Sequence, residues 1–151
     1  MVQDVKLKFR AAPRLLCVAR GAVRGFMENL GFNQDCASEV VLAVDEACTN
    51  AIRHAYEGRL DGILELAMRA DEAYIEFELR DHGQPAVKER IRPCPIPDRN
   101  AATVQPGGLG MQLIRQVFDE VDFRPGRLQG NRITMRIRRP PKLTTEAQAA
   151  N

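Results

Sequence analysis

The sequence predicts an α+β two-layer sandwich, in which helices cover one face of a mixed, mostly antiparallel sheet. The first observation behind this prediction is the order of the expected elements: strand, helix, helix, strand, strand, a long aperiodic segment, helix, strand, strand. Strands that follow one another in pairs favour antiparallel pairing, and amphipathic helices need an apolar sheet face to cover. The second is that 151 residues, 44% hydrophobic and 28% charged, suit one globular domain.

The N-terminal segment alternates apolar and charged residues, which is the period of a half-buried strand. Val5, Leu7 and Phe9 share one face of it. Pro13 then suits the first turn of a helix, and Gly31 suits the C-terminal cap of that helix. Between them, apolar residues recur at steps of three and four. The sequence therefore predicts a strand followed by one amphipathic helix.

A second helix is predicted from residues 33–35 to about Tyr56, because its apolar residues again follow helical spacing. Gly58 comes just after the last of them and breaks the pattern. Residues 63–68 and 73–80 then alternate as two strands joined by a short turn. This part of the chain predicts a helix followed by an antiparallel hairpin.

The segment from His82 to Pro106 contains five prolines and no clear period. Loops of this length inside a compact domain are uncommon, and many of them are functional lids. A third helix is predicted to open at Gly110. The last two predicted strands span residues 121–124 and 132–138.

We expect one domain over residues 1–139 and a flexible C-terminal tail over residues 140–151, since the tail has almost no apolar bulk. No apolar run is long enough to span a membrane, and the N-terminus lacks the apolar centre of a signal peptide. We therefore expect a cytoplasmic protein with no membrane partner. The four cysteines form no C-x-x-C pair, which favours free thiols over a disulfide or a zinc site.

Basic residues gather at the last predicted strand. A group of this kind can bind nucleic acid, but a solvated strand face is its more ordinary origin, and the formal net charge is only +2. We expect no direct nucleic-acid partner. The group consists of Arg132, Arg136, Arg138, Arg139 and Lys142.

The second predicted helix carries the first candidate site, in the run from Asp45 to Asn50. Glu46 and Asn50 are four residues apart and so share a helix face. An amide oxygen can ligate Mg²⁺ while a carboxylate accepts a proton from a nucleophile. A polar helix surface would give the same pattern, so this run alone leaves both interpretations open.

The second candidate site is Asp81-His82-Gly83, at the end of a predicted strand. An ionised Asp only accepts hydrogen bonds, so it can receive the exocyclic amine of adenine, and Gly lets the backbone approach a ligand closely. An Asp-x-Gly step is also an ordinary turn.

The third candidate site is Gly107-Gly108-Leu109-Gly110, which runs directly into the third predicted helix. Glycines at a helix N-terminus leave backbone amides free to face phosphate oxygens, and the helix dipole favours an anion there. The run lacks the Lys-Ser/Thr of a Walker phosphate loop, and no parallel strand precedes it as in a dinucleotide-binding fold. A flexible hinge is the alternative.

Taken in order, these runs resemble the ATPase superfamily shared by DNA gyrase, histidine kinases, mismatch-repair proteins and a heat-shock chaperone. The resemblance is strongest to the anti-sigma-factor serine kinases of the RsbW and SpoIIAB type, and it covers roughly residues 5–139. It implies the histidine-kinase-like ATPase fold. The segments that carry it are residues 45–51 with 54–56, 81–85, 107–110 with 113–114, and 119–121.

The resemblance also implies a role for each candidate residue. Glu46 would be the general base and Asn50 the ligand of Mg²⁺. Asp81 would read adenine, with Gly83 behind the ring, and residues 87–106 would be the ATP lid. The phosphates of ATP would be held by Gly107, Gly108, Leu109 and Gly110.

Two positions depart from the family pattern or lack a clear role. The last strand has Asn131-Arg132-Ile133-Thr134 where many superfamily members have Gly-Thr, which leaves Thr134 as a candidate hydroxyl to support Asp81. His54 is expected to have a structural role at the end of the second helix.

The function implied is a serine-protein kinase that uses ATP and Mg²⁺ to phosphorylate a small anti-sigma-factor antagonist, forms a homodimer and sequesters a sigma factor. A detached histidine-kinase domain is disfavoured because the chain is too short to include a phospho-accepting hairpin, and a gyrase-like role because no transducer domain follows. A non-catalytic ATP-binding anti-sigma or adaptor module stays open, although such a module has no need for the base Glu46.

Overall fold

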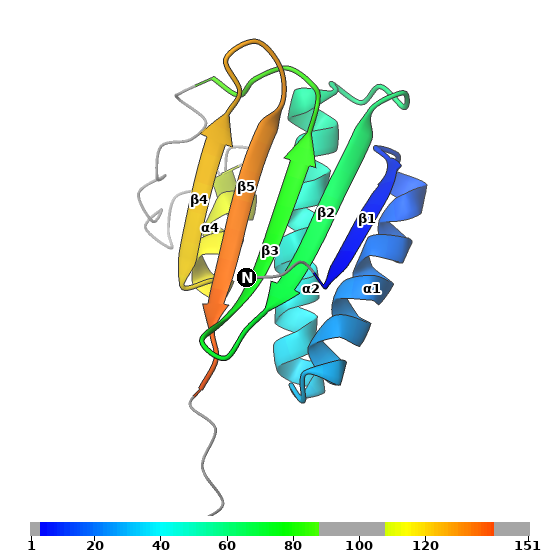
Figure 1. Ribbon diagram of the computed structural model, residues 1–151. Helices are drawn as coiled ribbons and strands as arrows, with labels where there is room; N and C mark the ends of the chain where they lie inside the picture. The colour runs from blue at the N-terminus through cyan, green and yellow to red at the C-terminus, as the bar shows by residue number, and fades with distance from the viewer. Residues whose placement is uncertain (1–3, 88–107, 141–151) are drawn as a thin grey trace, which may run out of the picture.

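The computed structural model describes residues 4–87 and 108–140 and has the predicted two layers (Figure 1). The predicted lid, apart from Val87, and the predicted tail, apart from Pro140, lie outside the described residues. The strands of the sheet are β1 (Val5–Arg10), β2 (Ile63–Ala70), β3 (Tyr74–Asp81), β4 (Glu120–Pro125) and β5 (Asn131–Arg138). They lie in the order β1-β2-β3-β5-β4. All neighbours pair antiparallel, so the α+β prediction is confirmed but this sheet is not mixed.

The second layer consists of helices that all lie behind one face of the sheet (Figure 1). These helices are α1 (Leu16–Asn29), α2 (Gln34–Asn50) and α4 (Gly108–Val117), with a short 3-10 turn η1 (Pro13–Leu15) before α1 and a π-helix η2 (Ala51–Ala55) after α2. Among the described residues, no helix combines the length and the apolar character needed to cross a membrane.

Two helix boundaries differ from the prediction. The third helix begins at Gly108 rather than Gly110, because glycine can adopt helical backbone angles and so need not mark the helix boundary. The second helix stops being a regular α-helix at Asn50 and continues as η2, which the bond from the Tyr56 amide to the Ala51 carbonyl closes at 3.3 Å. Apolar periodicity alone cannot distinguish one π turn from a continued α-helix, and such turns are frequent at functional sites.

Two neighbouring helix ends carry local capping signals, of which the one at Gly31 was predicted. Gly31 adopts φ +87° directly after α1, a backbone conformation that glycine adopts without strain. The Asn33 side chain accepts a hydrogen bond from the Cys36 amide at 2.8 Å, so it caps the N-terminus of α2. These two residues set the tight connection between the first two helices.

The core lies between the helices and one face of the sheet. Ile75, Phe77 and Leu79 alternate along β3 toward the helices and are almost fully buried. The Phe77 ring meets Phe26 of α1 edge-on at 6.2 Å and Phe118, just after α4, at 5.8 Å. One central side chain therefore joins the sheet to both ends of the helical layer.

The cysteines agree with the prediction of free thiols where they are described. Cys17, Cys36 and Cys48 are free, and burial raises the pKa of the Cys48 thiol to about 12. Cys48 is therefore a small core residue rather than a reactive group. Cys94 lies outside the described residues.

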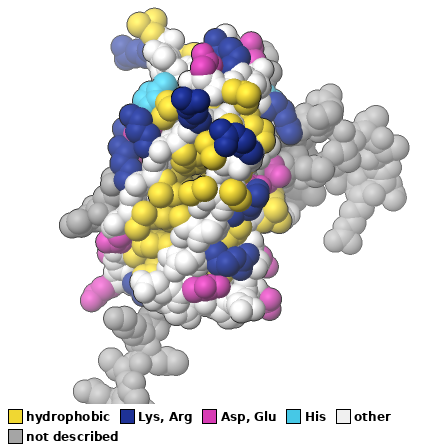
Figure 2. All heavy atoms as spheres, turned by 90° about the vertical axis from the view of Figure 1, so that its right-hand side faces the viewer, with side chains coloured by type: hydrophobic (Ala, Val, Ile, Leu, Met, Phe, Trp, Pro, Cys, Tyr) yellow, Lys and Arg dark blue, Asp and Glu magenta, His cyan; other side chains and the backbone are white. Residues whose placement is uncertain are grey.

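The side that carries α1 and β1 combines hydrophobic and basic side chains (Figure 2). Val18 of α1 is 53% exposed. On the edge strand β1, Lys6, Lys8 and Arg10 are exposed. Charged side chains on an edge strand disfavour pairing with the strand of another sheet, so this edge is protected.

Candidate functional site

The structure brings the first and third candidate runs together. Helix α4 packs against α2 so closely that a Cβ built on Gly110 would lie 2.8 Å from Oε2 of Glu46 and 3.2 Å from Nδ2 of Asn50. Real Cβ atoms essentially never approach within 3.0 Å of another heavy atom, so the Glu46 side chain would have to move to admit even alanine. The glycine therefore allows the start of α4 to lie directly against the Glu46 and Asn50 side chains.

The two neighbouring carboxylates on α2 have different surroundings. Asp45 accepts a hydrogen bond at 3.0 Å from Arg20 of α1, so it ties the two helices together. Glu46 and Asn50 are half-buried, and within the described ranges neither side chain has a hydrogen-bond or ion-pair partner. A carboxylate and an amide that the fold itself does not use are available to a ligand.

Asp81 ends β3 on the helix-covered face and is only 7% exposed. Its Oδ1 accepts the Gly83 amide at 3.0 Å, and the Asn131 amide group lies 3.1 Å from Oδ1 and 3.2 Å from Oδ2. Burial raises the pKa of Asp81, while these hydrogen bonds act in the opposite direction. A carboxylate offers about four lone-pair sites, so Oδ2 keeps capacity for a further donor.

Asn131 is the residue that sequence reasoning missed. It lies opposite Asp81 in the β3–β5 register, and besides holding the carboxylate it donates to the Gln84 carbonyl at 2.9 Å and accepts the Ala86 amide at 2.7 Å. One side chain therefore orders the whole loop that follows Asp81. Its place on the apolar face of β5, with Ile133 and Met135, was the signal that could have found it.

The suggestion that Thr134 supports Asp81 is wrong. Thr134 pairs with Glu78 and Asp122, and its side chain lies on the sheet face opposite the helices. Side chains alternate between the two faces of a strand, so residues 131 and 134 cannot share one. An amide rather than a hydroxyl supports the carboxylate.

Gly83 is required by the contact between the loop after β3 and the π-helix. A Cβ at this position would lie 2.2 Å from the Ala55 carbonyl oxygen, and that same oxygen accepts the Gln84 amide at 2.8 Å. The Gly83 carbonyl accepts the Gly130 amide at 2.7 Å. The Asp81 loop is therefore held between η2 and the turn before β5.

Tyr56, directly after η2, fixes the same loop from a third direction. Its hydroxyl accepts the amides of His82 at 2.7 Å and Ile63 at 3.2 Å, and donates to the Ile63 carbonyl at 2.6 Å. The residue is 4% exposed. A single buried phenol therefore links the end of α2, the start of β2 and the end of β3.

Tyr56→Phe should lower the free energy of unfolding by about 1–3 kcal/mol, because buried backbone groups lose their partner. Urea titration followed by circular dichroism measures this change. Tyr74→Phe is the matched control, since the Tyr74 hydroxyl has no partner among the described residues. Equal stability changes in the two variants would contradict the assigned role of the Tyr56 hydroxyl.

The remaining candidates are placed less fully. Gly108 and Leu109 form the first turn of α4, while Gly107 lies outside the described residues. His54 is half-buried within η2, at the end of the second helix as expected, and its structural role stays a prediction.

The oxygen donors fit Mg²⁺ better than a softer metal. Asn50 and Glu46 offer an amide oxygen and a carboxylate on one helix face, next to the helix start at Gly108. In the described part of the chain, no group of three His, Cys, Asp or Glu residues could enclose an ion. Mg²⁺ is commonly held by one or two protein oxygens together with substrate phosphates, so a sparse donor set suits it.

Comparisons with known proteins give the family of the chain. The family model for the histidine kinase-like ATPase domain matches residues 9–137. Serine-protein kinase RsbW of Oceanobacillus iheyensis is 30% identical over 120 residues, which cover 78% of this chain and 76% of that protein. Serine-protein kinase RsbW of Listeria innocua is 28% identical over 125 residues, covering 80% and 79%.

A solved structure supports the fold. The mycobacterial sensor histidine kinase MprB superposes with a TM-score of 0.50 at 16% identity, covering 89% of this chain and 99% of that one. The family model spans most of the chain, and one relative is 30% identical over more than three quarters of both proteins. The chain therefore belongs to the histidine kinase-like ATPase domain family, in its RsbW-type branch.

Proposed function

We propose that this protein is an ATP-dependent serine-protein kinase that phosphorylates a small anti-sigma-factor antagonist. The observation that carries the proposal is the close approach of Gly110 to Glu46 and Asn50. It sets a potential base and a potential metal ligand beside the helix start where phosphates bind well. Kinase chemistry needs these groups together, because phosphoryl transfer depends mainly on positioning and charge stabilisation.

Each residue then has a defined task. Glu46 accepts the proton of the substrate serine hydroxyl, and its oxygens are available because no described residue bonds to them. The Asn50 amide oxygen would hold Mg²⁺, which when bound neutralises charge on the phosphates. The backbone amides of Gly108, Leu109 and Gly110, in the first turn of α4, face the phosphate oxygens.

Recognition of the adenine ring is assigned to Asp81. Its buried Oδ2 accepts the adenine amine, while Asn131 and Gly83 fix the carboxylate in place. Rigid support of this kind reduces the ordering cost of binding. Gly83 supports the site indirectly, because a Cβ there would lie 2.2 Å from the Ala55 carbonyl oxygen and would push the Asp81 loop away from η2.

The names of two relatives support the kinase activity in the proposal. Those from Oceanobacillus iheyensis and Listeria innocua are named serine-protein kinases, and this chain covers more than three quarters of each. We extend to this protein a cytoplasmic location, a homodimeric state, an antagonist substrate and a sigma factor as the second partner.

The proposal is tested by incubating the purified protein with Mg²⁺ and γ-labelled ATP, together with small antagonist-like proteins from the same genome. We expect labelled phosphate on a serine of one of them, and nucleotide binding in a parallel calorimetric titration. Nucleotide binding with sigma-factor binding but no transfer to any antagonist would instead identify a non-catalytic module. No nucleotide binding at millimolar ATP would contradict the whole assignment.

A further inference from the structure

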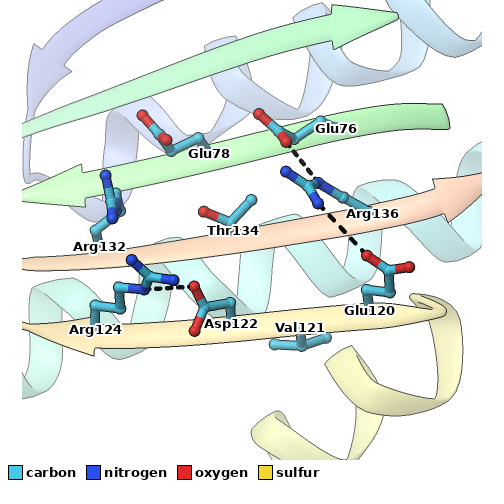
Figure 3. Close-up of a pocket in the computed structure, with 9 residues that line it drawn as sticks. All are labelled: Glu76, Glu78, Glu120, Val121, Asp122, Arg124, Arg132, Thr134 and Arg136. Carbon is cyan, nitrogen blue, oxygen red and sulfur yellow. Dashed lines mark hydrogen bonds and ion pairs between the residues drawn. The ribbon is translucent and has the colours of Figure 1, made fainter. Parts of the chain in front are cut away.

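The face of the sheet turned away from the helices is almost entirely charged, and its side chains form rows across the strands. At the end near the β2–β3 turn, one row alternates in sign and each member is paired with the next. Glu76 is paired with both Arg69 and Arg136, and Arg136 lies 3.5 Å from Glu120. Figure 3 shows part of this row, from Glu76 through Arg136 to Glu120. In this row each charged side chain has a neighbour of opposite charge within the protein itself.

The opposite end of the same face is built differently. Arg132 of β5 lies directly opposite Arg80 of β3 and directly opposite Arg124 of β4. Three arginines therefore occupy one row on three neighbouring strands, an arrangement called here the arginine row. Like charges directly opposite each other destabilise a sheet, so this row lowers the stability of the isolated protein.

The outer two arginines have partners, and the central one has none among residues 4–87 and 108–140. Arg80 donates to Glu78 at 2.7 Å, two residues back on β3. Arg124 lies 2.6 Å from Asp122, two residues back on β4. On β5 the residue in line with Glu78 and Asp122 is Thr134, which has no charge.

Among the described residues, the Arg132 side chain therefore has no ion-pair or hydrogen-bond partner. It is only half-buried, so a ligand can reach it. Within the described part of the chain, the middle of the row is a guanidinium without a counter-ion, with a further guanidinium on each side.

A hollow lies over this part of the sheet. Its volume is about 310 Å³. In Figure 3, Arg132 and Arg124 stand at one end of it, and Thr134 of β5 lies between Glu78 of β3 and Asp122 of β4. None of the residues assigned to nucleotide binding lines it. The lining residues at the arginine row include Glu78, Asp122, Arg124, Arg132 and Thr134.

We propose that the arginine row is a docking site for a short acidic segment of a protein partner. Guanidinium groups bind carboxylates through paired hydrogen bonds, and a carboxylate on Arg132 would lie beside both neighbouring arginines. Adjacent strands are about 4.8 Å apart, so the row spans about 10 Å. Two carboxylates at positions i and i+2 of an extended segment, about 7 Å apart, fit along it.

Nucleic acid fits this surface less well. Glu78 and Asp122 lie one row away, and Glu65 stands opposite Arg80. A continuous phosphate backbone that crossed the row would meet these carboxylates, whereas a short peptide ends before it does. The docking site also lies on the opposite face of the sheet from Asp81 and Glu46, so it is independent of the proposed nucleotide site.

The test measures binding of a fluorescent oligo-glutamate peptide by anisotropy, with oligo-glutamine as the neutral comparison. We expect the wild type to bind oligo-glutamate with an affinity that falls as salt rises, and Arg132→Glu to bind about 10- to 100-fold more weakly. Arg138→Glu is the matched control, with the same change on the same strand and face but outside the row. It should retain most of the affinity, and nucleotide binding should be unchanged in both variants.

A second variant separates docking from folding. Arg132→Thr removes the repulsion within the row, so it should raise the melting temperature by about 1–4 °C while it weakens peptide binding, by less than Arg132→Glu does. The proposal is overturned if the wild type does not prefer oligo-glutamate, if Arg138→Glu loses as much affinity as Arg132→Glu, or if Arg132→Thr lowers stability. It is also overturned if Arg132→Glu only disrupts self-association in sedimentation while the wild type binds no peptide, because the face would then be covered by a second copy.

Discussion

The Glu46→Gln variant is expected to transfer phosphate about 10²- to 10⁴-fold more slowly than the wild type while it still binds ATP. This range is the usual contribution of a general base. Glutamine keeps the shape of the side chain beside Gly110 but cannot accept a proton from the substrate serine. Binding persists because Asn50, Asp81 and the start of α4 are unchanged. Single-turnover transfer of labelled phosphate, run beside calorimetric ATP titrations, separates the two effects.

Asp45→Asn is the matched control for this experiment. It makes the same chemical change one residue earlier on α2, where the carboxylate binds Arg20 rather than facing α4. A partly exposed ion pair contributes little, so transfer should change only slightly. Asn50→Ala should instead weaken the binding of Mg²⁺-ATP itself. Transfer at the wild-type rate in Glu46→Gln would show that Glu46 is not the base.

The second large effect is expected from Asp81→Asn, which should weaken nucleotide binding about 10²-fold. A hydrogen bond to a charged group contributes about 1.5–3 kcal/mol when both partners are buried. The amide would present a donor where adenine also presents one. Its own amide group would in addition face the Asn131 amide, which lies within 3.2 Å of both carboxylate oxygens. Asp122→Asn, on the opposite face of the sheet, should bind ATP as the wild type does.

A double variant distinguishes loss of recognition from loss of folding. Exchanging the pair in Asp81→Asn/Asn131→Asp restores a carboxylate–amide contact but places the carboxylate on β5. Thermal stability should recover toward the wild type, whereas nucleotide affinity should not. Recovery of both would mean that the position of the carboxylate does not matter, and the adenine assignment would fail.

The pH dependence follows from the raised pKa of Asp81. The carboxylate must be ionised to accept the adenine amine, so affinity should fall as pH drops through a value above the usual range of Asp. The free energy of unfolding should instead rise as the pH falls through the same range. The pKa of Asp81 is raised in the folded state, so protonation removes the cost of burying its charge. Titrations of ATP and urea across mildly acidic pH measure both trends, and neither contribution should remain in Asp81→Asn.

Much of the fold could be predicted because its signals are local. Alternation identified the strands, spacing of three and four identified the helices, and Gly31 marked the end of the first helix. The pairing of Glu46 with Asn50 on one face likewise follows from helical geometry alone. The π turn after Asn50 was missed because one extra residue in a turn leaves the apolar pattern almost unchanged.

The sequence by itself determined the order of the elements, the candidate residues and the family resemblance. Only the tertiary structure decided which residues meet. The pairing of β3 with β5 set Asp81 opposite Asn131 and Arg80 opposite Arg132, and the packing of α4 on α2 brought Gly110 to Glu46. Registers and helix contacts between segments far apart in the chain depend on how whole surfaces fit together, and no local period encodes them.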